Sequence, residues 1–260
     1  MWLHHVRRGS GKPLLLVPGL GGTWQSWDLI LDALAREREV IAVDLPGFGA
    51  TPPLTGEVSI ATLTDAVEAF IDEQGLAGID TVGSSMGGQM VLELARRGVG
   101  GTIVALAPGG FWRPGQQRVL GISLRASVKL VRALQPALPL LTGNPVTRTL
   151  LLAQLSARPW ALPRELVLRE LRGYATAPSF DDALDALVAG PPQRGAPAGS
   201  TPGAVVIGWG RQDRVTFPSE AANATMLFPG ARLHWFDHCG HFPHWDAPAE
   251  TIRLILAGTA

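Results

Sequence analysis

The sequence has almost no cysteine. Cys239 is the only one among 260 residues, so a framework of internal disulfides is excluded and the chain suits a reducing compartment. Residues 1–8 lack the charged start, the apolar stretch and the small-residue cleavage site of a signal peptide. We therefore expect a cytoplasmic protein.

The sequence also lacks an excess of charge and a long apolar run. Lysine plus arginine number 22 and aspartate plus glutamate number 22, which gives no strong electrostatic argument for a nucleic-acid partner or an anionic membrane. No stretch of about 18 consecutive apolar residues occurs, so no membrane span is expected. The balance is uneven along the chain, because residues 111–200 carry 11 basic and 5 acidic side chains and the remainder has the opposite excess.

Short apolar runs alternate with amphipathic stretches through the first 110 residues. The runs predict strands at residues 2–8, 12–17, 40–43, 79–82 and 102–106, and the stretches predict helices at 25–35, 59–73 and 86–97. Strands and helices that alternate at this length indicate an α/β fold, a mostly parallel central sheet with helices on both faces.

This alternation stops after Pro108. Residues 111–200 predict helices separated by prolines, at 119–134, 146–156, 164–174 and 180–188, with Ser179 and Asp182 spaced as a capping box. Strands at 204–207 and 232–236, and helices at 219–227 and from Asp246 onward, then resume the first pattern. We predict one core, residues 1–110 and 201–260, interrupted by a helical lid of residues 111–200 that covers the ligand-binding end of the sheet.

One serine lies between a predicted strand and a predicted helix. Residues 83–87 read Gly-Ser-Ser-Met-Gly, the Gly-x-Ser-x-Gly pattern of a nucleophile elbow, in which glycines make room for a sharp turn. The pattern predicts Ser85 as a nucleophile, and Ser84 falls on a variable position. In a chain with 31 glycines the match needs support from its context.

Four segments together resemble the α/β-hydrolase family. They are the Pro-Gly-Leu-Gly-Gly loop at residues 18–22 (the glycine loop), Asp-Leu-Pro-Gly-Phe-Gly at 44–49, the elbow at 83–88 and Gly-His-Phe-Pro at 240–243. The elbow and the histidine segment are also similar to those of cofactor-free haloperoxidases and related esterases. The resemblance covers nearly all of the chain except the lid sequence, and it implies the α/β-hydrolase fold with the lid inserted after the sixth strand of the family's sheet.

The resemblance also implies a catalytic triad in the family's order of serine, acid and histidine. Ser85 would attack a carbonyl carbon, His241 would take the serine proton, and Asp213 would orient and stabilise the imidazole. The backbone N–H groups of Leu20 and Met86 would bind the developing oxyanion.

Two other aspartates and one departure from the family pattern bear on this assignment. Asp237 is a weaker candidate for the acid, and Asp44 is better explained as a structural turn residue. The glycine loop has Pro18 where the family usually has histidine, so we expect a reshaped loop with the Leu20 amide intact.

The histidines near the C-terminus offer one alternative chemistry. His238, Cys239, His241 and His244 form the one cluster suggestive of a metal, but no second group of ligands has metal-site spacing. We expect no cofactor and no metal.

A serine nucleophile disfavours haloalkane dehalogenation and epoxide opening. We expect a serine hydrolase of the carboxylesterase kind, whose partner is a small-molecule ester with a small to medium, largely apolar acyl group. A thioesterase, a lactonase or a carbon–carbon (diketone) hydrolase would use the same triad, and a ligand-binding protein with little turnover is an alternative of another class. Trp24 and Trp112 are candidate pocket walls or core residues, and the oligomeric state is left open.

Overall fold

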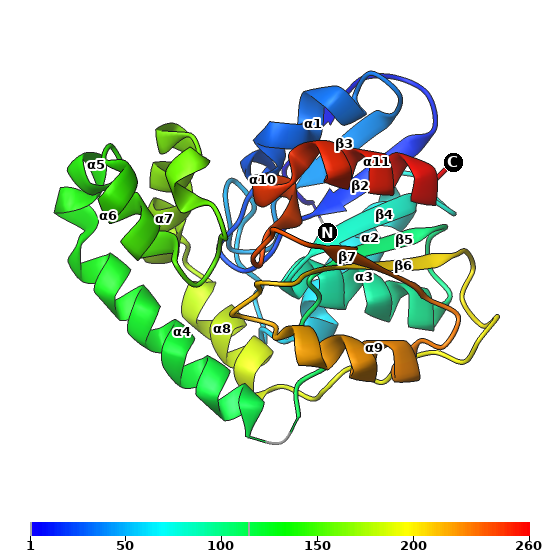
Figure 1. Cartoon of the computed structure of the whole chain (residues 1–260). Coiled ribbons are helices and arrows are strands. Elements are labelled where there is room, and N and C mark those ends of the chain that lie inside the picture. Colours follow the sequence, from blue (N-terminus) through cyan, green and yellow to red (C-terminus); the bar gives the residue numbers. More distant parts are fainter. Residues whose placement is uncertain (1, 114) are drawn as a thin grey trace.

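Seven strands form one sheet in the computed structural model, which describes residues 2–113 and 115–260. Its order is β1-β3-β2-β4-β5-β6-β7, and every neighbouring pair is parallel except β1 with β3 (Figure 1). The strands are β1 (His5–Arg8), β2 (Pro13–Val17), β3 (Glu39–Val43), β4 (Asp80–Ser84), β5 (Ile103–Leu106), β6 (Val205–Gly210) and β7 (Arg232–Phe236). The prediction of a mostly parallel sheet is confirmed.

Helices cover both faces of the sheet. One layer contains the 3-10 helix η1 (Trp24–Trp27), α1 (Asp28–Leu34) and α11 (Pro248–Gly258), and the other contains α2 (Ile60–Glu73), α3 (Met86–Arg97) and α9 (Ala221–Leu227). Side chains alternate along a strand, so Leu14 and Leu16 pack with Trp27 on one face while Leu15 and Val17 pack in the other core. The uninterrupted apolar run of β2 follows from this double burial.

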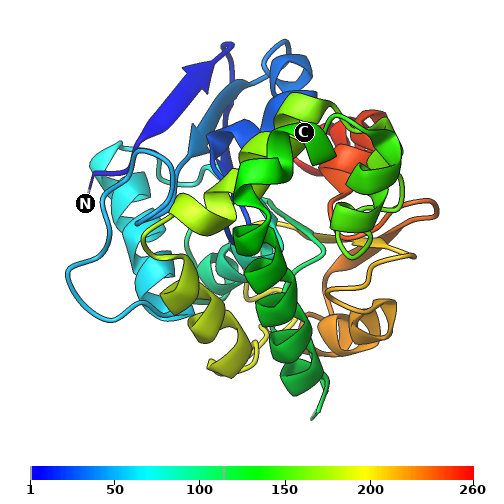
Figure 2. The ribbon, with the colours of Figure 1, turned by 90° about the vertical axis from the view of Figure 1, so that its left-hand side faces the viewer.

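Five helices lie between β5 and β6, in the predicted lid segment. They are α4 (Gln116–Ala133), α5 (Leu138–Leu141), α6 (Pro145–Leu152), α7 (Arg164–Thr176) and α8 (Phe180–Ala189), with the 3-10 turns η2 (Gln135–Ala137) and η3 (Pro159–Ala161) among them. Figures 1 and 2 show them together on one side of the molecule. We call residues 111–200 the helical segment, and its exact boundaries stay a prediction. No helix in the described residues is long and apolar enough to cross a bilayer.

Two local predictions are wrong. Ser179 precedes α8 but caps nothing with its side chain, because its ψ of 11° is not extended and its hydroxyl packs against Gly47. The last long helix begins at Pro248 and not at Asp246, which ends the short helix α10 (Pro243–Asp246). The Asp246 carboxylate instead accepts hydrogen bonds from other segments, so both polar side chains serve tertiary contacts.

Candidate active site

Ser85 occupies a sharp turn between β4 and α3. Its backbone angles, φ of 56° and ψ of −115°, lie in a region that residues other than glycine seldom adopt. A Cβ on Gly83 would come within 2.2 Å of the Gly87 carbonyl oxygen, and a Cβ on Gly87 within 2.3 Å of the Val17 oxygen. Both glycines are therefore required by close backbone packing around the turn.

The structure brings Ser85, His241 and Asp213 together. His241 Nε2 lies 2.8 Å from Ser85 Oγ, and His241 Nδ1 lies 2.9 Å from Asp213 Oδ2. All three side chains are buried. The imidazole of His241 thus lies between the Ser85 hydroxyl and the Asp213 carboxylate. In this geometry a histidine can accept the serine proton at Nε2 while its Nδ1–H donates a hydrogen bond to the carboxylate.

Asp213 is fixed by the chain that follows it. Its Oδ1 accepts backbone N–H bonds from Val215 at 2.8 Å and Thr216 at 3.1 Å, and its Oδ2 accepts the Thr216 hydroxyl at 2.8 Å. Sequence reasoning missed Thr216, although an Asp with a Thr three residues later is a common side-chain turn. The carboxylate therefore faces His241 in a single orientation.

The other candidate acids lie elsewhere. Asp237 is exposed and pairs with Arg211 at 2.7 Å. Asp44 accepts hydrogen bonds from His4 Nδ1 and from the backbone N–H groups of Trp24 and Ala50, so it ties three loop segments together. This agrees with the structural role expected for Asp44.

The glycine loop passes directly beside the serine. A Cβ on Gly19 would lie 3.1 Å from Ser85 Cβ and 3.7 Å from its Oγ, and the next residue, Leu20, lines the pocket that contains Ser85. Met86 is the first residue of α3, and the N–H of such a residue has no acceptor inside its helix. Both backbone segments are thus placed near the serine hydroxyl.

Helix α7 packs against the glycine loop and η1. A Cβ on Gly21 would come within 2.6 Å of the Tyr174 ring, so the ring packs directly on the glycine loop. Ser26 Oγ donates a hydrogen bond of 2.8 Å to Glu170 Oε1. Arg169 donates to the Gln25 carbonyl at 3.0 Å. Contacts from the helical segment therefore hold the loop that has Pro18 in place of the usual histidine.

Glu170 is the polar member of the buried face of α7. Burial raises its pKa to about 7, and the hydrogen bond from Ser26 opposes that rise. A glutamate at helical spacing among Leu166, Val167 and Leu171 was the available sequence signal, and sequence reasoning missed it.

The loop that carries His241 is held by Asp246. Its carboxylate accepts the backbone N–H groups of Gly240 at 2.7 Å and Ala157 at 2.8 Å, and also the Ser156 hydroxyl. The backbone N–H of His241 donates a hydrogen bond of 2.9 Å to the Leu155 carbonyl oxygen. The histidine loop and the chain after α6 thus form one hydrogen-bonded unit.

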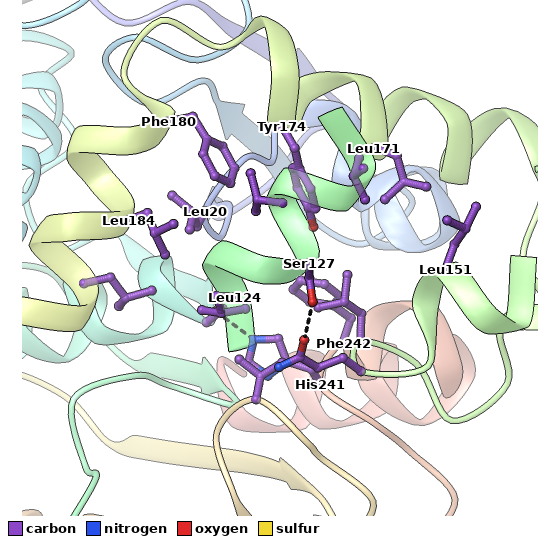
Figure 3. A pocket seen from close by; sticks show the side chains of 17 residues that line it. Leu20, Leu124, Ser127, Leu151, Leu171, Tyr174, Phe180, Leu184, His241 and Phe242 are labelled. Atoms are coloured by element: carbon purple, nitrogen blue, oxygen red, sulfur yellow. Dashed lines mark hydrogen bonds between the residues drawn. The ribbon is translucent and has the colours of Figure 1, made fainter. Parts of the chain in front are cut away.

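An apolar pocket lies over Ser85 and His241 (Figure 3). The cavity is narrow, with a volume of about 60 Å³. Its walls come mainly from α4, α7 and α8, and they include Leu124, Val128, Tyr174, Phe180 and Leu184.

Neither predicted wall residue lines this pocket. Trp24 packs beside the core on the α1 face and under the Arg8 guanidinium, and Trp112 is buried in the main core. Trp112 is therefore a core residue and Trp24 a partly buried residue at the edge of the core, and the helical segment supplies the pocket walls instead. Among the described residues that line the pocket there is no lysine and no arginine.

The histidine and cysteine cluster is not gathered around one point. Within the described chain no three His, Cys, Asp or Glu side chains are arranged to hold a metal ion. His244 packs on Trp27, with the two ring centroids 4.5 Å apart. Burial lowers the pKa of His244 to about 3. Burial also raises the pKa of the Cys239 thiol, which keeps it protonated.

The fold is that of an α/β-hydrolase. The model of the Alpha/beta hydrolase family matches residues 14–254, and the chain belongs to this family.

Two relatives show the range of proteins that resemble this chain. It is 29% identical, over 97% of its length, to the dihydrolipoyllysine-residue acetyltransferase component of an acetoin cleaving system from Cupriavidus necator, of which it spans 65%. It is 28% identical to a 2-hydroxy-6-oxo-2,4-heptadienoate hydrolase from Pseudomonas putida, with 97% of this chain and 90% of that one covered.

Solved structures agree on the fold. A thermophilic esterase from Thermogutta terrifontis superposes with a TM-score of 0.76 over 98% of this chain and 92% of that one, at 20% identity. At this identity the likeness shows the fold alone.

Proposed function

We propose that this α/β-hydrolase is a serine hydrolase that cleaves carboxylic esters with apolar acyl groups. The observation that carries the proposal is the array of Ser85, His241 and Asp213 beside an apolar pocket whose described lining residues include no lysine and no arginine. The serine supplies a nucleophile, and the pocket supplies a site for a hydrocarbon acyl chain.

The reaction follows from the positions of the three side chains. Ser85 Oγ attacks the ester carbonyl carbon while His241 Nε2 takes the hydroxyl proton, and Asp213 stabilises the resulting imidazolium. The carbonyl oxygen becomes an oxyanion that the N–H groups of Leu20 and Met86 bind. The carbon–oxygen bond to the alcohol then breaks, the alcohol leaves with the proton from His241, and an acyl-enzyme remains.

Water completes the cycle by the same route. His241 takes a proton from water as its oxygen attacks the acyl carbon, and then returns that proton to Ser85 Oγ when the carboxylic acid leaves. No co-reactant other than water is needed.

The pocket lining supports the choice of esters over the substrate named for one relative. A 2-hydroxy-6-oxo-2,4-heptadienoate carries a carboxylate, and a buried carboxylate needs a cation or several hydrogen-bond donors. The uncharged lining of this pocket suits an acyl chain without a terminal charge. Thioesters and lactones with apolar chains fit the same description and belong in the test.

The test compares wild type with Ser85→Ala and Ser84→Ala on a series of p-nitrophenyl esters, an acyl thioester, a lactone and a vinylogous diketone. We expect ester turnover in wild type and a loss of about 10⁴-fold or more in Ser85→Ala. Ser84 is a matched control, because its hydroxyl is buried beside Ser85 and has no hydrogen-bond partner among the described residues. Equal activity in all three proteins would contradict the proposal, and tight ligand binding without turnover in wild type would support a binding protein.

A further inference from the structure

The outer surface of the helical segment carries most of the exposed apolar side chains. Of the nine large hydrophobic residues in the described chain that are more than half exposed, seven lie in this segment. They are Val119, Ile122, Leu130, Leu140, Val146, Leu150 and Trp160, and we call these residues together with the exposed side of α4 the outer face. A concentration of this kind marks an interaction surface more often than chance exposure does.

Helix α4 is apolar on two sides. Its buried side, with Leu120, Val128 and Val131, faces the pocket and the core. Helical spacing places Ile122 and Leu130 on the opposite side, beside the cations. Figure 1 shows α4 at the edge of the molecule, and in Figure 2, which views the molecule from that side, no described element lies in front of α4.

The outer face is positively charged. No aspartate or glutamate occurs in the sequence between Glu93 and Glu165. Arg118, Lys129 and Arg158 are exposed and have no acidic partner within the described part of the chain. Although the whole sequence has no net charge, the outer face therefore has a local excess of cationic side chains together with exposed apolar side chains.

We propose that the outer face docks on the surface of an anionic lipid bilayer. Leucine, isoleucine and tryptophan side chains enter the boundary between headgroups and acyl chains, and the flanking arginine and lysine side chains contact lipid phosphates. Charge complementarity selects this occupant over a second copy of the chain, because two outer faces would set cations against cations.

The pocket reaches the surface at α4, on the side of the helix that carries Ser127. Ser127 is exposed, belongs to α4 and lines the pocket, and its hydroxyl donates a hydrogen bond of 3.1 Å to Gln154 Oε1 across the mouth. A docked molecule would hold this mouth near the lipid, where apolar esters concentrate. That consequence rests on the proposed function, whereas the docking itself does not.

Co-sedimentation with lipid vesicles tests the proposal. The protein carries Ser85→Ala, so lipid turnover and the outcome of the hydrolase test have no influence on binding. Vesicles of phosphatidylcholine alone are compared with vesicles of two parts phosphatidylcholine and one part phosphatidylglycerol. We expect binding to the anionic vesicles that weakens as salt is added.

Two pairs of variants separate the apolar and the charged contributions. Ile122→Ser/Leu130→Ser/Leu150→Ser should weaken binding about tenfold or more, while Trp2→Ser/Met226→Ser, at exposed apolar sites elsewhere, should leave it unchanged. Lys129→Glu should weaken it about fivefold or more, and Arg253→Glu, the same charge change on α11, should have little effect.

Three results would overturn the proposal. They are the absence of binding to anionic vesicles, equal losses in the test and control variants, and concentration-dependent dimerisation in sedimentation velocity that Lys129→Glu abolishes.

Discussion

Ser26 Oγ donates a 2.8 Å hydrogen bond to the Glu170 carboxyl group, although the two residues are 144 positions apart in the sequence. The same hydroxyl accepts the Thr23 backbone N–H at 3.1 Å, at the end of the glycine loop. Glu170 belongs to α7 of the helical segment. One hydroxyl therefore connects that segment to the loop that carries Leu20.

Glu170→Gln should make the protein more stable at neutral and alkaline pH. Folding raises the pKa of Glu170 from 4.5 to about 7, so between these values the folded chain keeps a proton that the unfolded chain releases. Stability contributed by this group is therefore lost as pH rises from about 4.5 to about 7, by up to about 3 kcal/mol. Glutamine keeps the acceptor for Ser26 and removes the titration. Urea unfolding at pH 5 and pH 8 measures the difference.

Glu220 is a second buried glutamate whose substitution serves as a control for Glu170→Gln. Burial raises its pKa to about 7 as well, and it contacts neither the glycine loop nor α7 in the hydrogen bonds of the structure. Glu220→Gln should remove its own share of the pH dependence, and the double variant should remove both. A pH dependence of unfolding in Glu170→Gln that equals the wild-type dependence would contradict the account of Glu170.

His244→Phe should make the protein more resistant to acid. Burial lowers the pKa of His244 to about 3 in the folded chain, and the nearby His241 adds to this effect. Unfolded chains bind the proton at about pH 6.5, so stability is lost as pH falls from about 6.5 to about 3, at up to about 1.4 kcal/mol per pH unit. Phenylalanine keeps the ring on Trp27 and cannot titrate.

Thermal unfolding at pH 6.5 and pH 4.5 checks this prediction. The variant should lose less stability on acidification than wild type does. Because Glu170 and Glu220 act in the opposite direction over the same range, the comparison is made between variants and not from the wild-type curve alone. Parallel losses in both proteins would contradict the buried, neutral state of His244.

Asp246→Ala should impair both folding and ester hydrolysis. The substitution leaves the Gly240 and Ala157 N–H groups and the Ser156 hydroxyl without their acceptor, at a cost of about 3 kcal/mol. It also frees the loop that positions His241, so kcat should fall more than KM rises. Asp237→Ala is the control, since Asp237 is exposed, lies three residues before Gly240 and should affect stability by less than about 0.5 kcal/mol.

Local motifs were sufficient to predict where the central side chains meet. Ser85, Asp213 and His241 each follow a strand of the sheet, and parallel strands end at a common edge, so order and spacing predicted their convergence. The elbow glycines were predictable for the same reason, because the turn itself requires them. Their catalytic roles stay predictions.

The walls and supports of the site were not predictable. The pocket depends on how α4, α7 and α8 pack over the sheet, and no local pattern sets that packing, so the sequence left Trp24 and Trp112 open between pocket wall and core. Glu170 and Asp246 bind donors that are distant in the sequence. A sequence shows that a buried carboxylate needs donors, but not which segment provides them.

Covalent labelling of Ser85 tests the central claim most directly. Wild type, Ser84→Ala and Ser85→Ala are treated with an alkyl fluorophosphonate, and intact mass and peptide mapping locate the adduct. The arrangement of Ser85 with His241 predicts one adduct per chain, on Ser85, in wild type and Ser84→Ala, and none in Ser85→Ala. Equal labelling of Ser85→Ala, or an adduct mapped to another residue of wild type, would contradict it.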